Sequence, residues 1–181
     1  MIEKSSRAEL DSHADTCGIN NTARILEYTN QAAEVSGLAN SMEPIQNIPI
    51  VKAALAYDHP ETGEVIVLII NQALYFGEQL YQILLNPNQS HAYGNIVDDV
   101  PRQFGGASHA SKIPDKNLSI PLNLRGIISH PYSDFFNQTE ENKEQVQFAI
   151  KAENQEHHET ADDIIVKVYN SRTFDELRTS N

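Results

Sequence analysis

The sequence contains little cysteine, little basic charge and no long apolar run. Its single cysteine, Cys17, excludes an intramolecular disulfide and favours a reducing compartment. Lys and Arg together number 13 against 25 Asp and Glu, which gives a formal net charge of -12. We therefore expect no direct nucleic-acid binding, because contacts to phosphates need a basic surface. No apolar run reaches the roughly 20 residues of a membrane span, so no membrane partner is expected.

The start of the chain and its composition indicate an intracellular, cytoplasmic protein with one main domain. Residues Met1 to Leu10 are polar and do not resemble a secretory signal peptide. Hydrophobic residues make up 40% of the chain and charged residues 21%, as in a soluble globular protein. The 181 residues suffice for one domain with a substantial core, or for such a domain with an appendage.

Strand patterns dominate residues 1–135, which we predict to form the main domain. The β-branched run from Val65 to Ile70 predicts a strand, and residues 49–57 predict another. Between these two segments, Pro60 fixes φ and Gly63 permits a positive φ. The sequence therefore predicts a long hairpin that reverses at these two residues.

Further strand segments lie on either side of this hairpin. Residues 24–29 and 33–36 predict a shorter hairpin that reverses at Asn30 and Gln31. Residues 117–124 alternate between apolar and polar side chains, the period of a half-buried strand. Many short strands separated by turns predict a mainly β fold with short helices, a small barrel or a sandwich.

After Phe136 the composition changes, and we predict residues 136–181 to be an acidic C-terminal extension that is partly helical or disordered. Residues 139–154 are rich in Glu, Gln and Asn and carry one thin apolar stripe at helical spacing. Residues 163–169 predict a strand, and capping-box spacing from Thr173 predicts a final helical turn.

The candidate chemistry begins at Asp11, which follows an apolar residue and precedes the hydroxyl of Ser12. An aspartic protease needs two neighbouring carboxylates that share one proton, so that one acts as a base on water and the other as an acid. Such a pair titrates as a unit, and the neighbouring hydroxyl joins the hydrogen bonds that hold it. The chain has only one such motif, so this chemistry requires a two-fold homodimer.

Three stretches of the sequence carry a resemblance to a known family. The first is LDSHADTC at residues 10–17, a variant of the Leu-Asp-Ser-Gly-Ala motif of retroelement proteases. The second covers residues 54–76, and the third covers residues 83–101, where a Leu-Leu turn and a short helix are expected. In this combination and order, the sequence resembles the aspartic-protease region of copia-type retrotransposon gag-pol polyproteins. The match extends more loosely to Ser129.

The resemblance implies a retropepsin-like fold and an aspartic endopeptidase with Asp11 and Ser12 as catalytic residues. Peptide bonds of a polyprotein or peptide substrate would be hydrolysed by activated water, with no metal, no cofactor and a second copy as partner. Leu74 and the pair at 84–85 would lie under the active-site loop. Substrate would be bound by the loop after Asp11 and by the long hairpin, which would serve as a flap. The implied substrate-binding residues are His13, Ala14, Asp15, Pro60, Glu61, Thr62 and Gly63.

One departure from the motif keeps a second function open. His13 stands where the family has glycine, which lets the backbone approach its symmetry mate and leaves an N–H for the carboxylate. A histidine adds a bulky titratable group beside the pair. The alternative is therefore a catalytically inactive protease-fold domain, retained for dimerisation or peptide binding.

The same residues also permit a metal site. In an extended chain, alternate side chains share one face, so Asp11, His13, Asp15 and Cys17 would line one side. All four side chains are competent zinc ligands, and His91, His109 or His130 would complete a set. Against this site, structural zinc sites usually pair ligands in short Cys or His clusters, and only one cysteine exists. The other interpretation makes Asp15 part of a turn and Cys17 a small buried residue.

Overall fold

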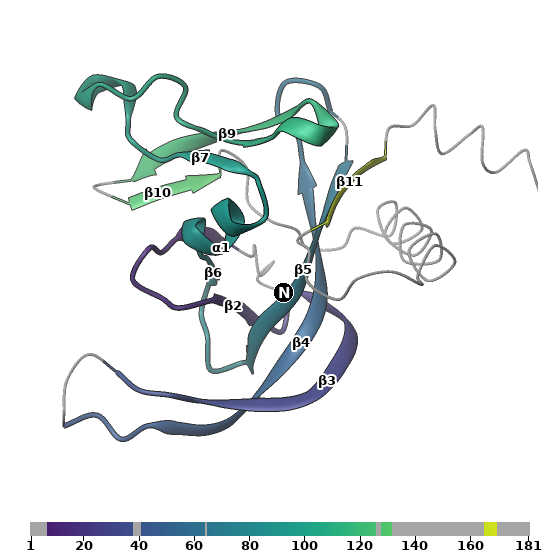
Figure 1. Ribbon diagram of the computed structural model, residues 1–181, viewed down its shortest axis with the longest axis vertical. Coiled ribbons are helices and arrows are strands. Elements are labelled where there is room, and N and C mark those ends of the chain that lie inside the picture. The colour runs from purple at the N-terminus through teal and green to yellow at the C-terminus, as the bar shows by residue number, and fades with distance from the viewer. Residues whose placement is uncertain (1–6, 38–40, 64, 126–127, 132–164, 170–181) are drawn as a thin grey trace, which may run out of the picture.

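A computed structural model describes residues 7–37, 41–63, 65–125, 128–131 and 165–169 (Figure 1). The protein is mainly β, as predicted, and its larger sheet curls into a half-barrel. This mixed sheet has seven strands. In spatial order they are β1 (Ala8–Leu10), β6 (Ile83–Leu85), β2 (Cys17–Asn20), β5 (Val65–Gly77), β4 (Ile45–Asp58) and β3 (Arg24–Val35), with β11 (Ile165–Tyr169) also paired to β5.

A second, antiparallel sheet of four strands lies beside the first (Figure 1). Its strands, in spatial order, are β10 (Ile128–Pro131), β9 (Leu118–Arg125), β8 (Ala110–Ile113) and β7 (Ile96–Asp98). The described helices are short: α1 (Pro87–Ala92) and two 3₁₀ turns, η1 (Arg102–Phe104) and η2 (Pro114–Lys116). Within the described residues, no helix has the length and apolar character needed to cross a membrane.

The long hairpin predicted around Pro60 and Gly63 is present as β4 and β5. Its antiparallel ladder runs from the pair of Ile50 with Leu74 to the pair of Asp58 with Val65. Both faces of β5 are buried, because alternate side chains enter two different clusters of buried residues. This burial of both faces explains why the sequence of β5 is a continuous run of apolar, mostly β-branched residues and does not alternate between apolar and polar ones.

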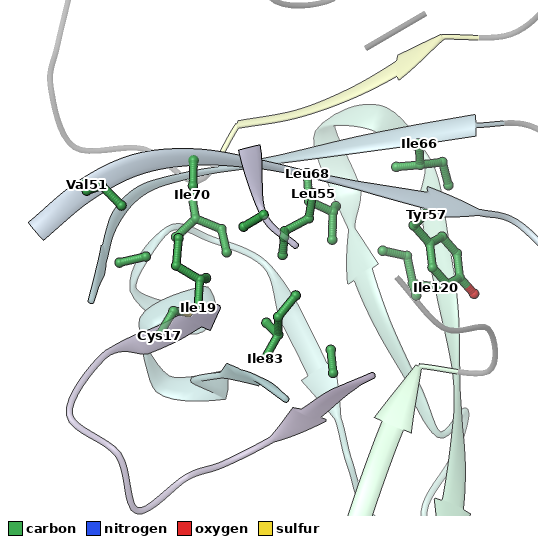
Figure 2. Close-up of a cluster of buried hydrophobic side chains, with 14 of the residues drawn as sticks. Cys17, Ile19, Val51, Leu55, Tyr57, Ile66, Leu68, Ile70, Ile83 and Ile120 are labelled. Atoms are coloured by element: carbon green, nitrogen blue, oxygen red, sulfur yellow. The ribbon is translucent and has the colours of Figure 1, made fainter. Parts of the chain in front are cut away.

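The main core fills the space between the two sheets (Figure 2). Strands β2, β4, β5 and β6 supply most of its side chains, and β9 supplies side chains from the smaller sheet. The labelled core residues are Cys17, Ile19, Val51, Leu55, Tyr57, Ile66, Leu68, Ile70, Ile83 and Ile120. Burying a large apolar side chain of this kind contributes roughly 1.5–3 kcal/mol to folding.

The edge of β5 that faces away from β4 is shared by two strands. Its C-terminal half pairs in parallel with β2, and its N-terminal half pairs antiparallel with β11, where Ile165 lies opposite Ile69. The strand predicted over residues 163–169 is therefore confirmed over Ile165–Tyr169, and it joins the main sheet. The helices predicted over 139–154 and from Thr173 lie outside the described residues.

The shorter hairpin predicted at Asn30 and Gln31 is wrong, because β3 runs through these residues as one strand. The ladder between β3 and β4 shifts its register between Tyr28 and Ala32, and Asn30 has a φ of 60°. Asn tolerates this left-handed backbone, so its turn-like signal marks an irregularity within the strand and no chain reversal. The reversal comes later, between Val35 and Ile45.

β3 and β4 continue beyond the last pair between β4 and β5 as a two-stranded arm. β4 residues 45–49 pair with β3, whereas the β4–β5 ladder stops at Ile50. We call this projecting part, residues 28–37 and 41–49, the β3–β4 arm. Most of its residues are exposed, and it extends away from the smaller sheet (Figure 1).

Candidate functional site around Asp11

Asp11 begins the turn that connects β1 to β2, and we call residues 11–16 the Asp11 loop. β1 lies parallel to β6, with Leu10 opposite Leu85, and the backbone N–H of Asp11 donates to the carbonyl of Leu85 at 3.0 Å. At the other end of the loop, Gly18 of β2 pairs with both Leu74 and Leu84. These leucines therefore pair with residues of β1 and β2 that flank the loop.

The carboxylate of Asp11 is held by its own loop and remains partly exposed. The backbone N–H of His13 donates to Oδ1 of Asp11 at 2.9 Å. Ser12 Oγ lies 3.5 Å from Nδ1 of His13, at the limit of a hydrogen bond. Ser12, His13 and Asp15 are exposed, and Ala14 is half-buried. The Asp11 carboxylate therefore lies in a loop whose exposed side chains a second molecule can reach.

The histidine at position 13 does not strain the loop. His13 has an ordinary negative φ, unlike Asn30 or His109, whose φ values are positive. Glycine's conformational freedom is therefore not needed at this position. The backbone N–H that glycine would offer to the carboxylate is offered by His13. What His13 adds to the loop is therefore an exposed imidazole.

The middle of the Asp11 loop is tied to the start of α1 by two asparagines. Asn86 is the N-cap of α1, since its Oδ1 accepts from the backbone N–H of Gln89 at 2.8 Å. The Nδ2 group of the same buried side chain donates to the carbonyl of Ala14. Asn88 Nδ2 donates to the carbonyl of Ser12 at 3.4 Å. One helix terminus thus supplies amide donors to two loop carbonyls.

The end of the loop is held by Gln89. Its Oε1 accepts from the backbone N–H of Cys17 at 2.9 Å and from the hydroxyl of Thr16 at 3.0 Å. Its Nε2 donates to the carbonyl of Gln72 on β5 at 2.9 Å. This one amide therefore joins the Asp11 loop, β5 and α1. Asn86, Asn88 and Gln89 together are called the α1 clamp below.

Cys17 faces the core and not the surface of the loop. Its side chain is 1% exposed, and Sγ accepts from the backbone N–H of Asn86 at 3.3 Å. Burial raises the pKa of the Cys17 thiol to about 11, although the hydrogen bond from Asn86 lowers it. With Leu10 and Leu85, it also lines an apolar cavity of about 60 Å³ between the sheets. Cys17 is therefore a neutral, packed thiol.

The metal site considered from the sequence is not assembled. Residues 12–16 form a turn and not an extended strand, so the alternation of side chains that would align four ligands is absent. Cys17 Sγ is buried, whereas His13 and Asp15 are exposed. Among the residues that the structure describes, no group of three or more His, Cys, Asp or Glu side chains is placed to hold a metal ion.

The turn from Pro60 to Gly63 lies at the far end of the β4–β5 hairpin from the Asp11 loop (Figure 1). The loop contacts β5 at Gln72, and the turn begins beyond Val65, so about 20 Å of strand separates them at roughly 3.3 Å per residue. Pro60, Glu61, Thr62 and Gly63 are exposed but are not near Asp11. The expectation that this turn forms a flap beside Asp11 is therefore wrong.

His59 fixes this turn to the smaller sheet. Its buried imidazole accepts the backbone N–H groups of Glu61 and Thr62 at Nδ1, each at 3.3 Å. Nε2 then carries the proton and donates to the carbonyl of Ser119 at 2.9 Å, a tautomer inferred from these partners. The ring also packs edge-on against Tyr57. A side chain bonded to β9 in this way gives the turn little freedom to act as a flap.

A second polar cluster fastens the loop between β7 and β8. Asp98 Oδ2 accepts from the backbone N–H of Ser108 at 2.5 Å and from its hydroxyl at 2.7 Å, and these bonds hold the pKa of Asp98 below its usual range. The Ser129 hydroxyl donates to the carbonyl of Asp99 and lies 3.2 Å from Nε2 of His109. Because that hydroxyl donates to a carbonyl, it is not poised as a nucleophile.

The clamp residues Asn86 and Gln89 and the turn residue His59 were not singled out from the sequence. A local signal existed for Asn86, because an Asn before Pro87 is a typical start of a helix. No local signal exists for Gln89, whose partners lie 17 to 73 residues away.

Comparisons with known proteins give no match for this chain. No protein-family model, no curated protein and no solved structure matches the chain.

Proposed function

We propose that this chain is a retropepsin-like aspartic endopeptidase of a retroelement polyprotein, active as a homodimer in which each copy contributes Asp11. One observation carries the proposal. The Asp11 carboxylate follows a strand of the main sheet, accepts the N–H of His13 at 2.9 Å, and is partly exposed in a loop fixed to α1. A carboxylate that is fixed and yet reachable is what a shared dyad requires.

The chemistry follows from two Asp11 carboxylates across a two-fold axis. Like charges at close range cannot both ionise, so the pair holds one proton. The ionised carboxylate takes a proton from water as the water oxygen attacks the peptide carbonyl carbon. At the same time, the protonated carboxyl donates its proton to the carbonyl oxygen. Proton transfer to the nitrogen then breaks the C–N bond. Ser12, exposed next to Asp11, is available to hydrogen-bond with the pair.

An extended peptide would lie against the exposed part of the loop at His13, Ala14 and Asp15. The β3–β4 arm, and not the Pro60–Gly63 turn, is the hairpin we assign to cover it. The arm projects on the side of the molecule where the Asp11 loop lies (Figure 1). It carries exposed apolar side chains suited to contact a peptide, since Tyr28 is 54% and Met42 61% exposed.

The second candidate is a catalytically inactive domain that dimerises or binds peptides. The exposed imidazole of His13 favours it, because this group stands beside the carboxylate that would have to share a proton. Substituting His13→Gly restores the family motif. A gain of cleavage in this variant would identify the imidazole as the inhibitory feature.

The proposal is tested by peptide-library cleavage between about pH 4 and 7, with Asp11→Asn as the variant and Asp115→Asn, at an exposed position of η2, as its matched control. Both substitutions remove one carboxylate, but only Asp11→Asn removes the dyad. We expect it to lose cleavage by roughly a thousandfold or more, because an amide cannot share the proton. The control should keep most of its activity. If the wild-type chain is a folded dimer and cuts nothing, the inactive domain becomes the better assignment.

A further inference from the structure

We propose that Gln89 is the positioning residue of this site, because its amide fixes the Asp11 loop within each single chain before two copies meet. This inference deepens the proposed function and rests on it for its catalytic consequence. Its structural part, the holding of the loop by Gln89, stands on contacts within one molecule.

The geometry of Gln89 makes it the point where three segments meet. Its carbonyl end faces two donors, the N–H of Cys17 and the hydroxyl of Thr16, and its NH₂ end faces one acceptor, the carbonyl of Gln72. The side chain is half-buried, so water competes only in part for these bonds. Losing it would break the side-chain link from α1 to the end of the Asp11 loop. The bond of 3.4 Å from the Thr16 hydroxyl to the carbonyl of Gln72 and the pair of Cys17 with Ala73 would still connect this end to β5.

The other contacts that hold the loop are longer or also serve another element. The Thr16 hydroxyl lies 3.4 Å from the carbonyl of Gln72, farther than the Gln89 amide at 2.9 Å. Asn88 makes only one long bond of 3.4 Å to the loop and is exposed. Asn86 binds the carbonyl of Ala14 but also caps α1, so its loss would disturb the helix itself. Gln89 is not the N-cap, and its side chain reaches out from α1. Unlike Asn86, it can therefore be replaced without removing the N-cap of α1.

An amide also suits a site whose carboxylates must titrate. Gln89 keeps the same donors and acceptors at any pH, so the loop stays fixed while an Asp11 pair gains or loses its proton. A carboxylate at this position would place an oxygen opposite the carbonyl of Gln72. Only the protonated form of that carboxyl could donate a hydrogen bond to this carbonyl. In the Gln89→Glu variant, the bond to Gln72 should therefore form in acid and break as the pH rises.

Cys17 provides a readout that does not depend on activity. It is the only cysteine, it is 1% exposed, and its backbone N–H is one of the groups that Gln89 binds. A pyridyl disulfide reagent, applied under native conditions between pH 5 and 8, reacts with this thiol only when the loop opens. The labelling rate of the wild type at each pH provides the reference.

We expect Gln89→Ala to raise the labelling rate of Cys17 about tenfold or more at every pH, because three hydrogen bonds are lost. Gln89→Glu should raise it at pH 8 and approach the wild-type rate at pH 5. The matched control is Gln103→Glu, which makes the same chemical change at an exposed position of η1 and should leave the rate unchanged. Labelling that is unchanged in both Gln89 variants would overturn the inference.

Kinetics then separate this inference from the proposed function. In an active dimer, Gln89→Ala should lower kcat at least tenfold with KM within about twofold, since the loop is misplaced but the peptide surface is kept. Faster labelling with unchanged kcat and KM would refute the positioning role. Faster labelling in a chain that never cleaves would support the clamp and refute the enzyme. If Gln89→Ala does not fold, the pH dependence of Cys17 labelling in Gln89→Glu tests whether Gln89 holds the loop.

Discussion

His59 fixes the Pro60–Gly63 turn and Gln89 fixes the end of the Asp11 loop, but the partners of these two side chains differ in kind. His59 binds N–H groups two and three residues ahead of it and adds one bond to Ser119 of β9. Gln89 binds groups in the Asp11 loop and on β5 that lie far from it in the sequence. The first turn can form from its own residues, whereas the second depends on the assembled sheet.

This difference bears on how the candidate site is built. The Asp11 loop is held at its start by β6, in its middle by Asn86 and at its end by Gln89, all within residues 83–89. A loop fixed by one distant segment keeps its geometry only while that segment is in register. We therefore expect substitutions in the clamp to affect function, and substitutions in the Pro60–Gly63 turn to affect stability alone.

The largest effect is expected for Asn86→Ala. This substitution removes the N-cap of α1, worth about 1 kcal/mol, and leaves the carbonyl of Ala14 without its donor at a cost of about 1–3 kcal/mol. The free energy of unfolding should fall by about 3 kcal/mol in urea denaturation. Asn88→Ala, which removes one long and exposed bond, is the control and should cost under about 1 kcal/mol. Equal losses would show that the buried amide does not hold the loop.

The second effect is an alkaline loss of stability that comes from Cys17. Its pKa is raised to about 11 in the folded chain, against an ordinary value of 9.0 in the unfolded chain. Folding favours the thiol, so this stability is fully present below about pH 9 and is lost as the pH rises toward 11.

At about 1.4 kcal/mol per pH unit, the loss from Cys17 reaches roughly 2–3 kcal/mol in order of magnitude. Cys17→Ala should be less stable at neutral pH, because packing is lost, but it should lack this alkaline slope. Denaturation of both proteins from pH 7 to 11 measures the difference curve. Parallel curves would mean that the thiol is not kept neutral by the fold.

The smallest effect on stability is expected for His59→Ala. This substitution tests whether the Pro60–Gly63 turn differs from the Asp11 loop in having no role in function. Losing the bonds to Glu61, Thr62 and Ser119 should lower the free energy of unfolding by about 1–2 kcal/mol. Cleavage per folded dimer should stay unchanged, because the turn is remote from the Asp11 loop. Glu61→Ala, at an exposed position of the same turn, serves as the stability control. A folded His59→Ala dimer with altered KM would restore this turn as a substrate-binding element.

Several features were predictable because neighbouring residues decide them. The β-branched run of β5, the reversal at Pro60 and Gly63, and the strand at 163–169 follow from local patterns. Asn30 shows where local reasoning fails, since a residue suited to a turn instead lies in an irregularity of one long strand. Its backbone preference was identified correctly, but the pairing with β4 determined its role.

The sequence by itself determined the mainly β character of the protein, the turn chemistry at residues 58–64 and the presence of an Asp-Ser pair next to an apolar residue. Only the tertiary structure decided which hairpin lies on the side of Asp11 and which side chains hold its loop. The physical reason is range. Backbone preference and hydrophobic periodicity act over a few residues, whereas the bonds from Gln89 to Thr16, Cys17 and Gln72 exist only once the register of β1, β2, β5 and β6 is set.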